Sequence, residues 1–81
     1  MTTITEHEFI ESGRRFLEER LGGGTEIGAD TELLDSGLVD SLLVLEFFFF
    51  LESVRGEEIV PDAASMAAIA TLRSAYKLVV A

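Results

Sequence analysis

The chain has 81 residues, 15 of them acidic and 6 basic, so we expect one small domain of net charge −9, without the clustered Lys and Arg of nucleic-acid-binding proteins. It contains no cysteine, which excludes disulfides and thiolate metal sites, and 48% of its residues are apolar, too many for a disordered chain. The longest apolar run, Leu42 to Leu51, is too short to span a membrane and the N-terminus lacks a signal-peptide pattern, so we expect a cytoplasmic protein.

The first predicted helix runs from Glu6 to Leu21. Thr5 and Glu8 have the spacing of a capping box, which marks a helix start. A stripe of residues then repeats at intervals of three and four, as on the inward face of a helix: Phe9, Gly13, Phe16, Leu17 and Leu21. Three successive glycines end this helix.

A long loop is predicted from Thr25 to Asp40. Turn-forming residues alternate there with isolated apolar residues, and one short turn is expected at Thr31 to Leu34. We expect four apolar side chains to hold the loop to the core: Ile27, Leu33, Leu34 and Leu38. Loops of this length in a small domain are uncommon and often functional.

Three further helices are predicted after the loop, at residues 41–55, at 61–67 and after Thr71. Asp40 and Thr71 can cap two of them, and Gly56 can end the longest. Helical spacing predicts that the last helix and the short one bury a common set of residues: Met66, Leu72, Ala75, Tyr76 and Val79. No strand pattern or repeat occurs, so the sequence predicts an all-α four-helix bundle, with three main helices and one short one, as a single domain over residues 1–81.

The sequence predicts no catalytic residue and no metal site, and therefore no enzyme activity. The single histidine, His7, lies in the first turn of a helix and is expected to be solvated. The acids between Asp30 and Asp40 lack the spacing of a calcium loop, because its obligatory glycine and glutamate would fall on Asp35 and Ser41.

Ser41 is the one position where we expect chemistry. It follows the loop and lies in the first turn of a helix, where unpaired backbone N–H groups favour an attached anion. No histidine or lysine is near it in the sequence to activate its hydroxyl, so another protein would have to modify it. Serine is also common at helix starts for structural reasons alone, and on the residues by themselves that alternative stays open.

Several segments resemble the acyl carrier proteins, small helical domains modified on serine by 4′-phosphopantetheine. The resemblance covers residues 5–80 and is carried by five segments: Asp30-Thr31-Glu32-Leu33-Leu34-Asp35, Asp40-Ser41-Leu42, Leu51-Glu52, Glu58-Ile59-Val60-Pro61-Asp62 (with Val60 as an extra residue) and Thr71-Leu72 to Val79. It implies that a phosphopantetheinyl transferase attaches the arm from coenzyme A to Ser41. It also implies that Asp40 helps the transferase bind through magnesium in that enzyme, and that the arm's thiol carries cargo as a thioester.

One departure from the family bears on the cargo. Two residues separate Gly37 from Asp40, where fatty-acid carriers usually have one, and this spacing is similar to D-alanyl and other aminoacyl carriers and to stand-alone carriers of specialised pathways. The resemblance thus implies a stand-alone carrier of acyl or aminoacyl groups in polyketide, nonribosomal peptide or related biosynthesis. Its partners would be a loading ligase or synthetase and a downstream synthase or transferase. The alternatives are a D-alanyl or aminoacyl carrier for cell-envelope modification, and an acidic helical interaction module in which Ser41 is unmodified.

A second departure concerns the partner surface of the helix 41–55, where family members usually carry more acids. Helical spacing turns Phe49 outwards, leaves Leu43 and Phe50 at the margins, and turns one set towards the bundle: Val44, Phe47, Phe48, Leu51 and Arg55. We expect a monomer whose partners bind an apolar patch on this helix, made of Leu42, Leu45 and Phe49. Three acids are expected around the patch: Asp40, Glu46 and Glu52. The alternatives are that a looser bundle buries Phe49, or that the patch pairs two copies of the chain.

Overall fold

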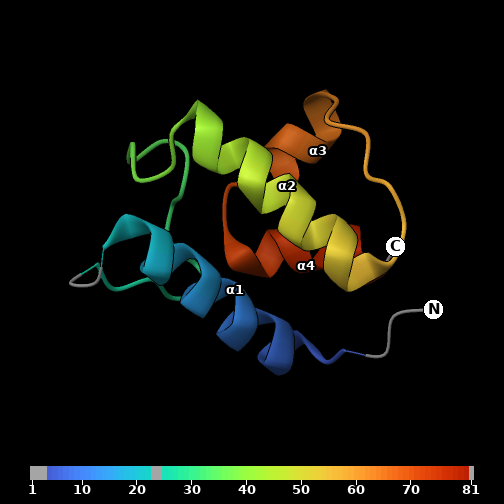
Figure 1. The fold of residues 1–81 in the computed structure, drawn as a ribbon, viewed down its shortest axis with the longest axis horizontal. Coiled ribbons are helices and arrows are strands. Elements are labelled where there is room, and N and C mark those ends of the chain that lie inside the picture. Colours follow the sequence, from blue (N-terminus) through green and yellow to red (C-terminus); the bar gives the residue numbers. More distant parts are fainter. Residues whose placement is uncertain (1–3, 23–24, 81) are drawn as a thin grey trace.

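Four α-helices surround one hydrophobic core in the computed structural model of the protein, which describes residues 4–22 and 25–80 (Figure 1). Helix α1 spans Glu6–Leu21, α2 spans Ser41–Arg55, α3 spans Ala63–Ala68 and α4 spans Leu72–Val80. No strand occurs within the described residues, so the predicted all-α four-helix fold is confirmed. None of the helices in this part of the chain is long and apolar enough to cross a membrane.

Local capping interactions set the ends of α1 and α2. The Thr5 hydroxyl accepts a hydrogen bond from the Glu8 N–H at 3.1 Å, and the Thr5 N–H donates to the Glu8 carboxylate at 3.0 Å, which completes the predicted capping box. Gly22 and Gly56 follow the two helices with φ of 87° and 82°, a left-handed conformation that glycine adopts at little cost. The predicted bounds of both helices are therefore confirmed.

Helix α3 begins later than the sequence predicts. The Asp62 carboxylate accepts a hydrogen bond from the Ser65 N–H at 2.9 Å and caps the helix, so Pro61 lies in the connector and not in the first turn. The helix ends at Ala68, one residue beyond the predicted end. Met66, expected in the core, is exposed, and Ser65 is the buried residue of this short helix instead.

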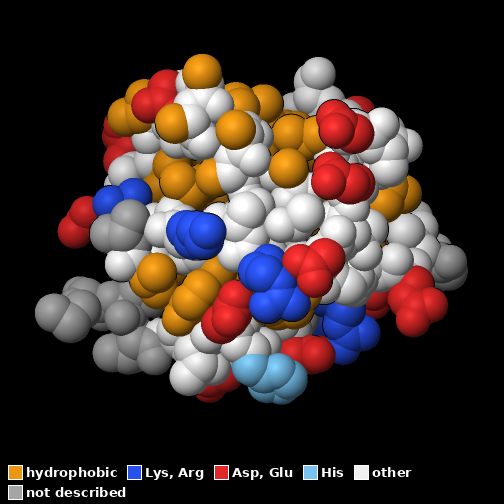
Figure 2. All heavy atoms as spheres, turned by 180° about the vertical axis from the view of Figure 1, so that it is seen from behind, with side chains coloured by type: hydrophobic (Ala, Val, Ile, Leu, Met, Phe, Trp, Pro, Cys, Tyr) orange, Lys and Arg blue, Asp and Glu red, His pale blue; other side chains and the backbone are white. Residues whose placement is uncertain are grey.

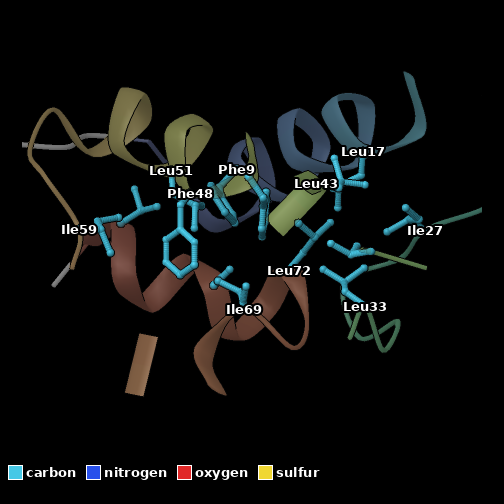
Figure 3. Packing of buried hydrophobic residues seen from close by; sticks show 14 residues of the cluster. Phe9, Leu17, Ile27, Leu33, Leu43, Phe48, Leu51, Ile59, Ile69 and Leu72 are labelled. Atoms are coloured by element: carbon cyan, nitrogen blue, oxygen red, sulfur yellow. The ribbon is translucent and has the colours of Figure 1, made fainter. Parts of the chain in front are cut away.

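Helix α4 is the centre of the packing, because it contacts each of the other three helices. The inward stripes predicted for α1 and α4 are buried or half-buried, and the half-buried Tyr76 donates its hydroxyl to the Ile4 carbonyl oxygen at 2.8 Å. A Cβ atom at Gly13 would lie 2.7 Å from a methyl carbon of Leu72, so the glycine lets α1 approach α4 closely. The helices thus enclose a continuous core, whose members are shown in Figure 3.

The inward face of α2 differs from the predicted one at its first turn. Phe47, Phe48 and Leu51 are buried as expected, but Leu43 is buried where Val44 was expected, and Val44 is only half-buried. The cause is the loop before α2, whose buried side chains extend the core: in Figure 3 Leu43 lies towards the end of the core that Ile27 and Leu33 fill. Helical spacing alone does not include this contribution of the loop.

The loop between α1 and α2 is attached to the core by more contacts than predicted. Ile27 and Leu33 are buried and Leu34 and Leu38 are half-buried, as expected, but the sequence did not single out Val39, which is also buried. The turns also differ, because the Thr31 N–H donates to the Gly28 carbonyl and the Gly37 N–H donates to the Leu34 carbonyl. The two turns therefore lie at residues 28–31 and 34–37, not at Thr31 to Leu34.

Candidate functional site

Ser41 is exposed and is the first residue of the 15-residue helix α2. Asp40 precedes it in an extended conformation and caps the helix, because its Oδ1 accepts a hydrogen bond from the Leu43 N–H at 2.9 Å. The Ser41 hydroxyl makes no hydrogen bond with any described residue. Ser41 thus lies exposed at the positive end of a helix, where a negatively charged substituent is stabilised.

Backbone hydrogen bonds connect the loop before this helix to the segment that precedes α4. The Leu33 N–H donates to the Ala70 carbonyl at 2.8 Å, and the Val39 N–H donates to the Leu33 carbonyl at 3.1 Å. Leu33 and Val39 are both buried, so side-chain packing and backbone bonding act at the same two residues. Ser41, two residues after Val39, is therefore held in a defined place relative to the core.

Ser36 has different surroundings, although Asp35-Ser36-Gly37 looks similar to Asp40-Ser41-Leu42 in sequence. Its hydroxyl donates to the Glu32 carbonyl oxygen and accepts from the Leu38 N–H at 3.4 Å. It lies in the turn that ends at Gly37, whose φ is 78°, and no helix begins there. Ser36 is thus a part of the loop structure and a natural control for Ser41.

The outward face of α2 is apolar, as predicted. Leu42, Leu45 and Phe49 have 67%, 51% and 61% of their surfaces exposed. Two hollows lie beside them. The connector groove, of about 300 Å³, lies between α2 and the segment that leads to α3, and the α1–α2 hollow, of about 220 Å³, lies beside Ser41. The first is lined by Leu45, Phe48, Phe49, Glu52, Glu58, Ile59 and Pro61, and the second by Arg20, Leu21, Leu38, Asp40, Leu42, Leu43 and Glu46.

The two α2 acids predicted to bind partners already have partners within the chain. Glu46 Oε2 lies 3.5 Å from Arg20 Nε of α1, and Glu52 Oε2 accepts a hydrogen bond from the Ile59 N–H at 2.9 Å. Sequence reasoning missed Arg20 and Ile59 at this site because both contacts join separate elements, and no local spacing indicates them.

The opposite side of the molecule carries charged contacts and a second apolar surface. Arg73 binds Asp30 through two hydrogen bonds of 2.8 and 3.2 Å, which lower the pKa of Asp30, and lies 3.6 Å from Glu6. Hydrophobic side chains gather at the upper left of Figure 2, over α3, where Val60 and Met66 are exposed. The structure thus separates a charged surface around Arg73 from the apolar surfaces of α2 and α3.

No conventional catalytic or metal centre is visible in the described part of the chain. His7 is exposed, and no three His, Asp or Glu side chains among residues 4–22 and 25–80 are grouped so that they could hold a metal ion. Comparison with protein-family models, curated proteins and solved structures finds no match. The candidate for chemical modification is therefore Ser41, an exposed serine at a helix start, beside an apolar face.

Proposed function

We propose that the protein is a carrier to which a separate transferase attaches 4′-phosphopantetheine at Ser41. The observation that carries this proposal is the exposed Ser41 hydroxyl at the N-terminus of α2, in a position that Val39 and Asp40 hold. A phosphodiester there would lie near the unpaired N–H groups of the first turn. Neither hollow beside α2 is lined by histidine or lysine among the described residues, so the base that removes the hydroxyl proton would come from the transferase.

The site has room for the attached group. Ser41 is exposed, and among residues 4–22 and 25–80 the exposed Asp40 carboxylate is bound through Oδ1 alone, in the cap, so its other oxygen can face the magnesium ion of a transferase. The arm, when bound, supplies the thiol that a chain without cysteine lacks, and that thiol can hold an acyl or aminoacyl group. The spacing from Gly37 to Asp40 is similar both to stand-alone carriers of specialised pathways and to D-alanyl and other aminoacyl carriers. We propose cargo of a specialised biosynthetic pathway, with a D-alanyl or aminoacyl carrier of cell-envelope modification as the alternative.

We propose that loading and downstream enzymes contact the outward face of α2. Its apolar part is Leu42, Leu45 and Phe49, and Glu46 and Glu52 lie beside it. An exposed apolar centre with a polar margin has the composition of a protein–protein contact surface. The two hollows beside this face are lined by four acids and one cation, Arg20, and this excess of negative charge disfavours pairing of two copies.

A second candidate is an acidic interaction module in which Ser41 stays unmodified. The observation that favours it is the 61% exposure of Phe49 beside the connector groove of about 300 Å³, which one fixed partner could fill. In this case the outward face of α2 would be used and the serine would not.

Intact-mass measurement separates the two candidates. The protein is incubated with coenzyme A, magnesium and a broad-specificity phosphopantetheinyl transferase, and is then weighed. A gain of one arm in the wild type and in Ser36→Ala, with no gain in Ser41→Ala, is the expected result for a carrier. A wild type whose mass does not change would favour the interaction module.

A further inference from the structure

Arg20, near the end of α1, brings a positive charge to the α1–α2 hollow, next to the start of α2. It lines the α1–α2 hollow together with Asp40 and Glu46, and its Nε lies 3.5 Å from Glu46 Oε2. The guanidinium carbon also lies 3.8 Å from the centre of the Phe16 ring, and a terminal nitrogen donates to the Phe16 carbonyl at 3.4 Å. Arg20 therefore has three separate contacts at one place.

The ring below Arg20 is itself held by the core. Phe16 stacks on Phe50 with centroids 4.7 Å apart and lies 6.2 Å from the buried Phe47. A cation over an aromatic face is attracted to it even when partly exposed. The Phe16 ring, packed in this way, supports the Arg20 guanidinium beside Glu46, although the Arg20 side chain is 37% exposed.

A partner that covers both Ser41 and the outward face of α2 would also meet Glu46. The two residues are five positions apart, about 7.5 Å along the helix axis and about 140° around it, and the exposed Leu42 and Leu45 lie between them. The acids Asp40, Glu46 and Glu52 would attract a basic partner surface, and Arg20 opposes that attraction and occupies one of the three carboxylates. A cation of the partner would have to compete with Arg20 for Glu46.

We infer that Arg20 is a specificity-determining residue of the partner face: it masks Glu46 and so weakens the binding of basic docking surfaces. This inference rests on the proposed modification of Ser41. Arg20 would act on the encounter and docking of the partner and not on the chemistry at the hydroxyl. Replacing it should therefore change kcat/KM for modification, and this change should become smaller as salt screens the charges.

The test measures kcat/KM for modification of Ser41 by the same transferase in about 50 mM and 500 mM salt. Arg20→Gln should raise kcat/KM about two- to fivefold at low salt, with little change at high salt. Arg15→Gln is the matched control, because it changes the net charge equally and Arg15 lines neither of the two hollows beside α2. Arg20→Lys, which keeps the charge, should stay close to the wild type, and circular dichroism should show that all variants fold.

A double variant tests whether Arg20 acts through Glu46. In a Glu46→Gln background, Arg20→Gln should change kcat/KM by much less than it does in the wild type. An equal effect in both backgrounds, a decrease in kcat/KM, or equal rates for Arg20→Gln and Arg15→Gln would overturn the inference and leave the carrier proposal standing. A wild type that is never modified would overturn the carrier proposal, and this inference with it.

Discussion

Phe47 and Phe49 are two positions apart in α2 and have opposite surroundings. Phe47 is 1% exposed and lies among the core side chains, whereas Phe49 is 61% exposed and borders the connector groove. The separation follows from the helical step of about 100° per residue, which prevents four successive phenylalanines from facing one side. An exposed apolar ring of this size fits the proposal that Phe49 contacts a partner protein.

Truncating these two residues should therefore have different effects. Phe49→Ala should change the free energy of unfolding by less than about 0.5 kcal/mol, as is usual for a surface position. Phe47→Ala should cost about 3–5 kcal/mol, because it leaves a cavity in the core. Urea denaturation measures both values, and a large loss for Phe49→Ala would show that the ring supports the fold.

Several single-residue properties of the site could be predicted from the sequence. The exposure of Leu42, Leu45 and Phe49 followed from helical periodicity. The intramolecular partners of Glu46 and Glu52 did not, because Arg20 is 26 positions before Glu46 and the Glu52 contact crosses the connector. The charge and type of each side chain can be read from the sequence, but contacts between side chains of separate elements cannot.

At the scale of elements, the segment between α2 and α3 is not helical and is joined to α2 through side chains, among them the ion pair of Arg55 with Glu57 at 3.7 Å. The hydrogen bond from the Ile59 N–H to the Glu52 carboxylate and the buried Ile59 side chain hold it beside the connector groove. Helix α3 makes its main helix contacts with α4. We therefore expect the connector to open locally more easily than the three longer helices.

Loss of the Glu52 carboxylate should release the connector without unfolding the protein. Glu52→Ala should speed hydrogen exchange at the Ile59 amide about tenfold, because a hydrogen bond to a charged group contributes about 1.5 kcal/mol. Glu58→Ala removes an equal charge from the same groove and should leave that amide protected. NMR exchange rates give the result, and equal rates in the two variants would contradict this role of Glu52.

The element bounds show which structural signals are local. The capping box of Thr5 and Glu8 and the glycines after α1 and α2 act within a few residues, so those bounds were predictable. The start of α3 was not, because Pro61 and Asp62 are both good helix-start residues and the side-chain acceptor of Asp62 decided the cap. The rotation of the α2 core face depended on the loop, which has no periodic pattern.

At the scale of the whole molecule, the charge of −9 and specific carboxylate contacts act in opposite directions as the pH falls. Hydrogen bonds from Thr5, Arg14, Arg73 and Ser65 lower the pKa of four carboxyl groups: Glu8, Glu11, Asp30 and Asp62, respectively. A carboxyl group with a lowered pKa stabilises the fold above its ordinary pKa, and this contribution is lost as the pH falls through the lowered value.

Stability should therefore rise slightly from pH 7 to about pH 5, where partial neutralisation relieves repulsion, and fall below about pH 4.5 as these contacts are lost. Asp30→Asn should reduce the fall, since one of the four groups no longer titrates. Urea denaturation across the pH series tests this, and a steady decrease between pH 7 and pH 5 would contradict it.

The hydrogen bond between the Leu33 N–H and the Ala70 carbonyl joins the segment that precedes Ser41 to the segment that precedes α4. A synthetic peptide with only residues 30–55 would keep the sequence on both sides of Ser41 and the Leu33 amide, and would lose this hydrogen bond. Recognition of such a peptide by a modifying enzyme should be poor, and adding residues 69–80 as a separate fragment should restore it to the extent that the two pieces associate. The serine is thus presented by both halves of the chain.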